Sequence, residues 1–568
     1  MRPPIPSFRT LISTLLLSSA LAAPGGAQTG AALSPPAAQA AGPDILAYIR
    51  GGWDTLSRSM AECKSLVDPK VLNEPVLYLP AGMNTPPALE LLKGQCRVRV
   101  EHLPRAVHQL GDIRPAELKD EGLLYLPNRY VVPGGRFNEM YGWDSYFIVL
   151  GLLHDNRDDL ARGMVDNFFF EIENYGALLN ANRTYFLTRS QPPLLSSMIR
   201  EVYEHPGAAP ALDKAWLAHA YAMAVRDHAL WTSDIHRAGN TGLARYFDIG
   251  AGPVPEMADD STYYPDVIRW LLAHPDSGAD YLLPAPEQPT PAEQAELART
   301  SCDMKASRVC AHAFASGHRL TAAYFQGDRA MRESGFDTSF RFGPFSGSTE
   351  NYAPVCLNSL LFKYEGDLAH FATLLGKPDE AARWTAAAEA RRAAMDKYLW
   401  NEQTGFFFDY DTATGKQSTY RYLSGFYPLW AGLASPAQAK RLEGHLHDFE
   451  HEGGLAMSTE ASGTQWDLPY GWAPTNWLTV QGLERYGDRA DAVRIAREFS
   501  ATVLDNFKRD GTIREKYNVV SGSANIAVAA GYKANVIGFG WTNGVYLRMQ
   551  DLLDGRSAQR ASPPGVSQ

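Results

Sequence analysis

Apolar residues recur every three or four positions in several long stretches of the chain, which is the spacing of a helix that buries one face. The stretches with this pattern are residues 214–231, 357–375, 378–399, 475–486, 491–507 and 542–553. In the stretch 378–399, Asp379 and Glu380 lie in the first turn, where the helix dipole favours negative charge. We see no regular alternation of strands with helices, which disfavours a doubly wound sheet. The pattern predicts an all-α fold.

Long segments rich in glycine, proline and aromatic residues separate the predicted helices. Two examples are residues 133–144 and 462–474. Loops of this length inside a compact domain are usually functional. Many antiparallel helices joined by such loops predict a toroid of helix pairs around a central pocket.

The composition is that of a large globular protein. The chain has 568 residues, of which 45% are hydrophobic and 20% are charged, so it can bury a sizeable core. Its 53 basic and 63 acidic residues give a formal net charge of −10. This charge disfavours nucleic acid or an anionic membrane surface as the main partner.

The first residues have the outline of a secretory signal peptide. Arg2 and Arg9 precede an apolar run over residues 11–23, which ends in small residues. The run is shorter than the roughly 20 residues that a spanning helix needs, although an uncleaved anchor is the alternative. No later segment is apolar enough to span a bilayer. The sequence therefore predicts a signal peptide over residues 1–23, secretion to the periplasm, and no membrane association after cleavage.

The remaining chain divides into three parts by composition. Residues 24–43 are rich in Ala, Gly, Pro and Gln and read as a flexible leader. We expect residues 44–554 to form one folded domain that acts as a monomer. Residues 555–568 are expected to form a disordered tail.

Five cysteines fit an oxidising compartment without requiring one. Cys63 with Cys96 and Cys302 with Cys310 are possible disulfides, which would leave Cys356 unpaired. Spacing alone does not fix this connectivity. The sequence has no Cys-x-x-Cys pair, which excludes a zinc ribbon and a thioredoxin-like site.

Two loop segments combine aromatic and charged residues in a way that suits a sugar. Residues 133–146 contain one Arg, two carboxylates and four aromatic rings, and residues 465–474 repeat this composition. Aromatic rings stack on the C–H faces of sugars, and charged groups hold hydroxyls in strong hydrogen bonds. A structural turn with a buried ion pair is the alternative for the first segment. Two such segments favour a sugar-binding pocket.

These two segments resemble the signature segments of trehalases, the inverting hydrolases of α,α-trehalose in glycoside hydrolase family 37. Further segments resemble the family in the same order along the chain: residues 180–185, 189–193, 333–337, 515–519 and 538–544. The resemblance extends over about residues 120 to 550, so it does not depend on one short motif. It implies an (α/α)6 toroid, a disaccharide substrate and no cofactor or metal.

The resemblance implies that Asp337 is the general acid and Glu515 the general base. Inverting cleavage needs one protonated carboxyl and one ionised carboxylate, separated by roughly 6.5–9.5 Å. Asp337 would keep its proton only if apolar burial or a nearby carboxylate raises its pKa, and Phe336 and Phe340 flank it. Lys516 follows Glu515 directly. Without the family context, a helix-capping Asp337 and a solvated Glu515 are the ordinary interpretations.

The same resemblance implies a set of substrate-binding residues. They are Arg136, Phe137, Trp143, Asp144, Asn180, Arg189, Ser190, Gln191, Glu256, Gly335 and Trp466. The Arg side chains would hold sugar hydroxyls, and Asp144 would accept hydroxyl protons. Trp466 and Trp472 are expected in the pocket wall, with a purely structural role as the alternative.

The chain departs from the family pattern at a few positions. Val254 stands where family members carry Arg, and Tyr532 and Lys533 stand where a substrate-contacting Glu is usual. Asn518 replaces a common Asp, and Phe336 replaces a common Trp. The loss of one Arg and one Glu could be compensatory, because an unpaired buried charge is costly. It could instead alter the subsite for the second glucose.

The sequence therefore predicts a secreted inverting α-glucosidase that hydrolyses trehalose. The alternatives are hydrolysis of another α-glucoside, a secreted sugar-binding protein without turnover and, more distantly, a polysaccharide lyase. A metal site at His445, His447 and His451 is possible, although such runs are usually solvated. Residues 284–291 are expected in an exposed loop. No nucleotide-binding glycine motif is present.

Overall fold

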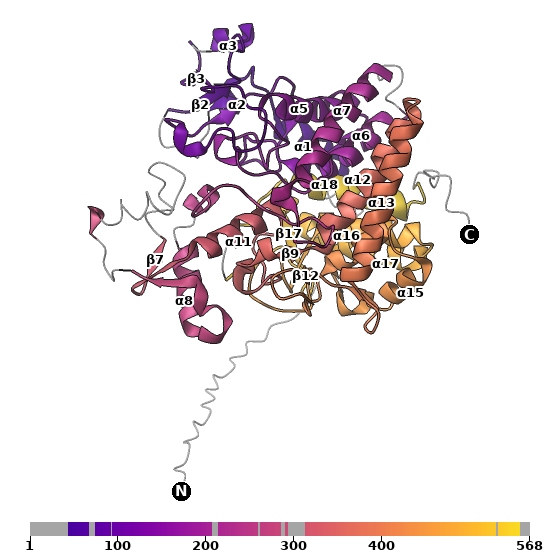
Figure 1. Ribbon diagram of the computed structural model, residues 1–568. Coiled ribbons are helices and arrows are strands. Elements are labelled where there is room, and N and C mark those ends of the chain that lie inside the picture. The colour runs from indigo at the N-terminus through magenta and orange to yellow at the C-terminus, as the bar shows by residue number, and fades with distance from the viewer. Residues whose placement is uncertain are drawn as a thin grey trace, which may run out of the picture. The chain divides into compact units, whose positions relative to one another are not determined.

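The computed structural model describes residues 44–67, 74–92, 94–206, 214–259, 262–285, 290–292, 313–529 and 532–556 (Figure 1). The chain divides into two units, Met1–Gly42 and Pro43–Gln568, and all described residues belong to the second. The predicted signal peptide and leader, the pair Cys302 and Cys310, and most of the predicted tail lie outside the described residues.

Helices make up most of the regular structure. They are α1 (Ile45–Leu56), α2 (Cys63–Leu66), α3 (Pro87–Leu92), α4 (Gly142–His154), α5 (Asp158–Asn174), α6 (Leu195–Tyr203), α7 (Lys214–Trp231), α8 (Tyr263–Ala273), α11 (Ala322–Glu333), α12 (Val355–Leu374), α13 (Pro378–Tyr398), α14 (Tyr427–Ala431), α15 (Pro436–Glu443), α16 (Ala473–Arg485), α17 (Arg489–Asp510) and α18 (Gly540–Leu553). All six stretches that the apolar spacing predicted as helices are helices, namely α7, α12, α13, α16, α17 and α18.

Helix α4 was not predicted, and its burial explains why. Every residue from Gly142 to Leu153 is buried, so the helix has no polar face and no amphipathic period. The expected loop over residues 133–144 is correspondingly too long, because its last three residues open α4. The expected loop over residues 462–474 is also cut short, by a strand and by the start of α16.

Short strands supplement the helices. They are β1 (Ser57–Arg58), β2 (Val76–Leu79), β3 (Arg99–His102), β4 (Leu123–Leu124), β5 (Tyr130–Val131), β6 (Leu282–Pro284), β7 (Phe314–Ala315), β8 (His318–Leu320), β9 (Tyr352–Ala353), β10 (Trp400–Asn401), β11 (Phe406–Phe407), β12 (Tyr410–Asp411), β13 (Lys416–Gln417), β14 (Glu450–His451), β15 (Gly454–Leu455), β16 (Tyr470–Trp472) and β17 (Lys516–Asn518). They pair in sheets of two or three strands. The all-α prediction is correct for the framework, but it missed these small sheets.

One of these sheets brings two sequence motifs together. Strands β16 and β17 are antiparallel, with Trp472 opposite Lys516 and Gly471 opposite Tyr517. The pairing places the end of the segment 465–474 beside the segment 515–519, although more than forty residues separate them along the chain.

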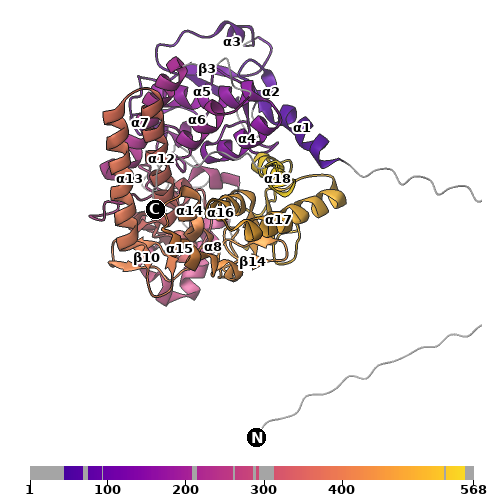
Figure 2. The ribbon, with the colours of Figure 1, turned by 90° about the vertical axis from the view of Figure 1, so that its right-hand side faces the viewer.

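The helices pack in sequence-adjacent pairs, such as α12 with α13 and α16 with α17. Helix α18, near the end of the chain, packs against α4 and α1, as Figure 2 shows. A continuous hydrophobic core extends from Ile45 to Leu552. The first and last helices of the described chain therefore share one core.

Two glycines allow α4 and α18 to approach each other closely. A Cβ atom added at Gly544 would lie 2.1 Å from the carbonyl oxygen of Phe147 in α4. A Cβ atom at Gly151 would lie 2.6 Å from the Cα atom of Gly544. Any side chain at either position would force the two helices apart.

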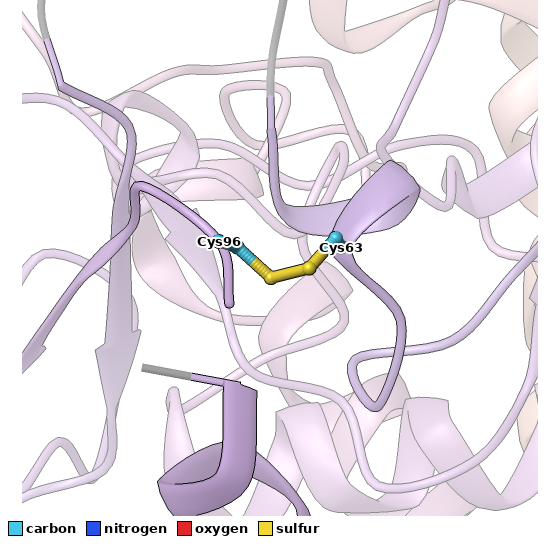
Figure 3. Close-up of a disulfide and its surroundings, with 2 residues drawn as sticks. All are labelled: Cys63 and Cys96. Carbon is cyan, nitrogen blue, oxygen red and sulfur yellow. A yellow bond between two sulfur atoms is a disulfide. The ribbon is translucent and has the colours of Figure 1, made fainter. Parts of the chain in front are cut away.

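Of the disulfides that the sequence left open, Cys63–Cys96 is formed (Figure 3). It joins α2 to the segment after α3, with the two Cα atoms 5.5 Å apart. Cys356 is a free thiol, buried in α12. Among the described helices, none has both the length and the apolar character that crossing a membrane requires.

The close contact of α4 with α18 leads to a stability prediction. We expect Gly544→Ala to destabilise the protein by about 1–3 kcal/mol, the usual cost of overpacking, because backbone faces the new methyl group. Thermal melting checks this. Gly51→Ala in α1 is the matched control, since nothing lies within 4 Å of its added Cβ, and it should leave the Tm unchanged or slightly higher. Equal Tm values for the two variants would contradict the close contact of α4 with α18.

Candidate active site

An aromatic cluster brings together four segments that are distant in sequence. The Trp143 ring in α4 lies 5.6 Å from Phe336, 5.8 Å from Trp466 and 5.6 Å from Trp541, measured between ring centroids. Trp466 stacks on Trp472 with 3.7 Å between centroids and an angle of 3°. These rings support the loops that carry the predicted catalytic residues.

Gly335 is required for this arrangement. Its φ of +75° lies in the left-handed region that favours glycine, and a Cβ atom there would lie 2.9 Å from Cε2 of Trp143. The predicted sugar contact at Gly335 is thus a place where backbone packs directly on an aromatic ring.

Asp337 follows this glycine and is held by its backbone. Gln465 Nε2 donates to the carbonyl oxygen of Asp337, and the backbone N–H of Trp466 donates to the carbonyl oxygen of Thr338 at 3.0 Å. The Asp337 side chain is 22% exposed, and its Oδ2 lies 3.4 Å from Nη1 of Arg332. The segment 465–474 therefore fixes the position of the predicted acid.

The surroundings of Asp337 favour its protonated form. Burial raises the pKa of Asp337 to about 7, with Glu256 adding to the rise, while Arg332 opposes it. A carboxyl with a pKa near neutrality can still hold a proton that it donates in a reaction.

A third carboxyl, Asp144, lies near the two predicted catalytic carboxyls. Burial raises the pKa of Asp144 well above its usual range, and the charges of Glu515 and Asp337 add to the rise. Because the effect of a charge falls off with distance, this coupling indicates that both carboxyls lie close enough to Asp144 to influence its charge.

Glu515 is anchored by its backbone next to β17. Its N–H donates to the carbonyl oxygen of Val536 at 3.0 Å, and Trp541 Nε1 donates to its carbonyl oxygen at 3.1 Å. The carboxylate lies 2.7 Å from Nζ of Lys516, which is itself fully buried and lies 5.0 Å from the centre of the Trp472 ring. The side chains of Glu515 and Lys516 therefore face each other as an ion pair.

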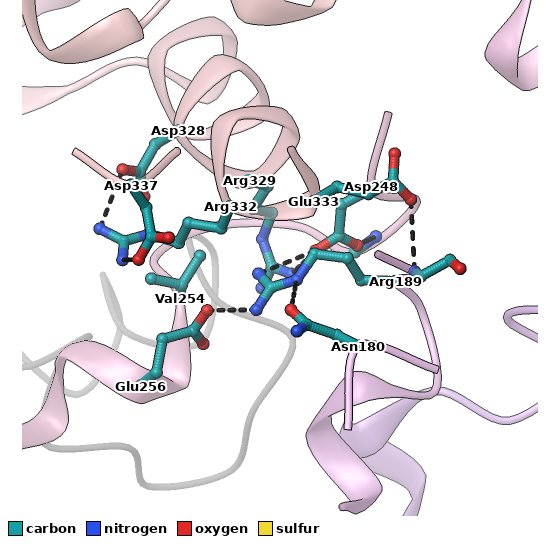
Figure 4. A network of polar contacts seen from close by, with 12 residues as sticks. Asn180, Arg189, Asp248, Val254, Glu256, Asp328, Arg329, Arg332, Glu333 and Asp337 are labelled. Atoms are coloured by element: carbon teal, nitrogen blue, oxygen red, sulfur yellow. Dashed lines mark hydrogen bonds and ion pairs between the residues drawn. The ribbon is translucent and has the colours of Figure 1, made fainter. Parts of the chain in front are cut away.

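A network of ion pairs forms the neighbouring wall of the site (Figure 4). Arg189 donates from Nε to Asn180 Oδ1 at 2.8 Å and from Nη2 to Glu256, and its Nη1 lies 3.6 Å from Asp248. Asp248 also accepts from Arg329 at 2.9 Å. The predicted residues Asn180, Arg189 and Glu256 are thus brought together as one unit.

Glu256, in the turn Pro255–Asp259, retains an unused acceptor. Its Oε1 accepts from Arg189, but its buried Oε2 has no hydrogen-bond partner among the described residues. A buried carboxylate oxygen without a partner is costly, so it suits an incoming hydroxyl donor.

Two other predicted residues bond to the protein itself. Gln191 Oε1 accepts from the N–H of Trp143 at 2.9 Å. Ser190 donates from Oγ to the carbonyl oxygen of Leu178 at 2.6 Å, and its N–H donates to Glu333 at 3.3 Å. Both side chains hold the start of α4 and its surroundings in place.

Arg136 and Phe137 lie apart from this network. Arg136 is exposed, and its guanidinium lies 4.7 Å from the centre of the Phe137 ring. Phe137 packs edge-on against Tyr141 at 5.4 Å. Arg136 therefore faces solvent, whereas Phe137 is half-buried and packs against the hydrophobic core.

With the geometry established, comparison with known proteins identifies the family. A family model described as Trehalase matches residues 82–267 and 282–554 of this chain, which is more than half of its length. The chain belongs to the trehalase family. The family resemblance seen in the sequence is confirmed.

Individual relatives agree with this trehalase assignment. A probable trehalase from Eremothecium gossypii is 37% identical over 74% of this chain and 57% of the relative. A cytosolic neutral trehalase from Beauveria bassiana is 36% identical over 78% of this chain and 60% of the relative. The chain thus spans less than two thirds of the length of these relatives.

A solved structure shows the same fold. The neutral trehalase Nth1 from Saccharomyces cerevisiae is 30% identical, with a TM-score of 0.73 over 90% of this chain and 94% of that chain. This similarity supports the helical framework described above.

The predicted secretion is wrong in the light of these trehalases. Relatives from Beauveria bassiana, Neurospora crassa and Saccharomyces cerevisiae are named cytosolic neutral trehalases. The expectations of a signal peptide and of a periplasmic location rested on one short apolar run and its flanking charges. A short apolar run reflects only the local amino-acid composition. It is therefore a weak basis for predicting a cellular location.

The structure also locates the departures from the trehalase pattern. Val254 is fully buried in an apolar cluster against which Tyr532 packs. The Tyr532 hydroxyl accepts from Nη1 of Arg332 at 3.1 Å. Lys533 points elsewhere, with its Nζ 3.4 Å from Thr262. Tyr532, and not Lys533, therefore reaches the network around Asp337.

Sequence reasoning missed Arg332, the cation beside the predicted acid. It immediately precedes the segment 333–337, and it lies four residues after Asp328 in α11. Side chains at this spacing share one helix face, which was a usable signal for the Arg332–Asp328 ion pair. In the described residues, no group of three or more His, Cys, Asp and Glu side chains is arranged to hold a metal ion.

The raised pKa of Asp337 leads to a pH-dependent prediction. The folded protein holds this proton up to a pH of about 7, whereas the usual pKa of the side chain is 3.8. Stability is therefore greatest below the lower value and falls as the pH rises through about 7. We expect Asp337→Asn to raise the Tm relative to the native protein, with a gain that grows from pH 5 to pH 8 and reaches a few kcal/mol in order of magnitude.

Thermal melting across this pH range measures the effect. Asp505→Asn in α17 is the control, because this side chain is 68% exposed. If the Tm gain from Asp337→Asn stays constant with pH, or declines as the pH rises, the Asp337 carboxyl is not protonated in the folded protein.

Proposed function

We propose that this protein is an inverting glycoside hydrolase that cleaves α,α-trehalose into two glucose molecules. The observation that carries the proposal is a pair of unlike carboxyls near Asp144: Asp337, whose pKa burial raises to about 7, and Glu515, which is paired with Lys516. The names of the relatives support trehalose as the substrate.

The two carboxyls have the properties that inversion requires. Asp337 donates its proton to the glycosidic oxygen as the bond breaks, so the leaving glucose departs as a neutral alcohol. Glu515 accepts a proton from a water molecule that attacks the opposite face of the sugar. The Lys516 ammonium compensates the charge of the Glu515 carboxylate in this buried place.

The surrounding residues bind the two sugars. Asn180, Arg189 and Glu256 form hydrogen bonds with hydroxyls, and the free oxygen of Glu256 accepts one of them. Asp144, near the two catalytic carboxyls, forms a hydrogen bond with a hydroxyl of the sugar. The remaining substrate contacts that we propose are Arg136, Phe137, Trp143, Ser190, Gln191, Gly335 and Trp466.

We also propose that residues 44–554 form one (α/α)6 toroid and that the protein acts as a monomer. The packing of sequence-adjacent helices in pairs and the contact of α18 with α4 support a closed ring of helices. The site lies among the loops and helix starts of this ring, which is where a toroid has room for a pocket.

A sugar-binding protein without turnover explains the site less well. Binding of a neutral sugar requires hydrogen-bond partners, but it does not require a buried carboxyl that holds a proton at neutral pH. Burying such a group costs stability, and catalysis gives a reason to retain it.

Glucose release from trehalose tests the proposal. We expect the native protein to release glucose, and Asp337→Asn and Glu515→Gln each to lower kcat roughly 10²–10⁴-fold, because each removes one proton transfer. A coupled glucose assay measures this, with melting curves to confirm that the variants are folded. Asp505→Asn, an exposed change of the same chemistry, should keep the native rate.

Near-native turnover in either catalytic variant would contradict the assigned roles. No glucose release by the folded native protein would contradict the proposed substrate.

A further inference from the structure

The guanidinium of Arg332 is anchored on the side away from Asp337. Its Nε and Nη2 pair with the two oxygens of Asp328, at 3.3 Å and 3.2 Å. Asp328 in turn accepts hydrogen bonds from the hydroxyls of Tyr263 at 3.2 Å and Tyr264 at 2.7 Å. A planar guanidinium held by two parallel bonds has little freedom to move.

Only Nη1 of Arg332 faces the proposed acid. It lies 3.4 Å from Oδ2 of Asp337 and 3.1 Å from the hydroxyl of Tyr532 (Figure 4 shows the two Asp residues on either side of the guanidinium). Charge-assisted pairs of this kind usually close to about 2.7–2.9 Å. The contact with Asp337 is longer than this range, and it is longer than the contact of the same nitrogen with Tyr532.

Tyr532 is placed to maintain this longer contact. Its ring packs against the apolar cluster that contains Val254, and the Arg332 guanidinium lies 5.8 Å from the ring centre. Burial raises the pKa of Tyr532, so the hydroxyl stays neutral and accepts the N–H of Arg332 without competing as an anion.

We propose that Tyr532 is a positioning residue that holds Nη1 of Arg332 back from Asp337, so that Asp337 keeps its proton at neutral pH. The catalytic consequence rests on the proposed role of Asp337 as the general acid. The positioning itself depends only on the geometry of three side chains.

Charges of both signs face Asp337. Arg332 from α11 and Arg189 from the segment before α6 favour the ionised carboxylate. Glu256 from the turn Pro255–Asp259 and Asp144 from α4 favour the protonated form. Since burial raises the pKa of Asp337 to about 7, a small movement of Arg332 toward Asp337 would change the protonated fraction of this carboxyl near neutral pH.

Removal of the hydroxyl tests the proposal. In Tyr532→Phe, Nη1 of Arg332 loses its other acceptor and closes on Asp337, which stabilises the ionised form. We expect the basic limb of the pH profile of kcat/KM for trehalose to move to lower pH by about half a unit or more. At pH values on the basic side of this limb, the variant should have about one third of the native kcat/KM.

A second substitution gives the opposite sign. In Tyr532→Glu, a carboxylate holds Arg332 more firmly and adds negative charge near Asp337, so the basic limb should move to higher pH. A purely structural role of Tyr532 would lower activity in both variants without opposite shifts. Tyr486→Phe is the matched control, because it also removes one hydroxyl hydrogen bond, to the carbonyl oxygen of Ala434, at the end of α16.

A readout that does not depend on activity separates the two proposals. The pH dependence of the Tm gain from Asp337→Asn, measured with Tyr532 and with Phe at that position, reports the pKa of Asp337 in each background. A lower pKa in the Phe background supports the positioning role, even if the native protein does not hydrolyse trehalose, a result that would overturn the proposed function alone. An unchanged or higher pKa overturns the positioning role, whatever the activity.

Discussion

The burial of negative charge around Asp337 is the constraint on which the site depends. Taking a carboxylate out of water is costly unless a cation or hydrogen-bond donors compensate it. Most of the carboxylates here have such a partner: Arg332 for Asp328, Arg189 for Glu256, and Lys516 for Glu515. Asp337 has only a long contact with Arg332. Burial raises the pKa of Asp337 to about 7, and it raises the pKa of Asp144 well above its usual range. For Asp337, this incomplete pairing suits the acid role that we propose.

The helices and their loops hold the carboxyl groups of the site at fixed separations. Asp144 is carried by a helix that is buried on every side, Asp337 by a turn packed on Trp143, and Glu515 by the pairing of β16 with β17. Side chains with this support lose little entropy when a sugar binds, because their positions are already set. The close contact of α4 with α18 then joins the start of the catalytic region to its end.

How much of this could be predicted from the sequence depends on the kind of signal. Helix α17 was predicted because its buried residues recur every three or four positions, which leaves an amphipathic period in the sequence. Helix α4 was not, since uniform burial removes that period. Asp337 and Glu515 were found through the family motifs that contain them. The predicted periplasmic location was wrong, because it rested on one short apolar run and its flanking charges.

The network around Asp337 could not have been predicted in full. The pairing of Arg332 with Asp328 follows helical spacing, but the hydrogen bond from Arg332 to Tyr532 joins residues 200 positions apart and exists only in the folded chain. The sequence showed that Val254 and Tyr532 both depart from the family pattern. Their packing in one cluster supports the interpretation that the two departures are compensatory, since an apolar residue at one position leaves no cation for a carboxylate at the other.

The stereochemistry of the first glucose released is the most direct test of the central claim. Proton NMR of the purified protein with trehalose resolves the two anomers before mutarotation mixes them. Attack by a water molecule that Glu515 activates, with Asp337 as the acid, inverts one anomeric centre and releases α- and β-glucose in equal amounts in the first minutes. Early release of α-glucose alone would mean retention at that centre and would contradict the mechanism.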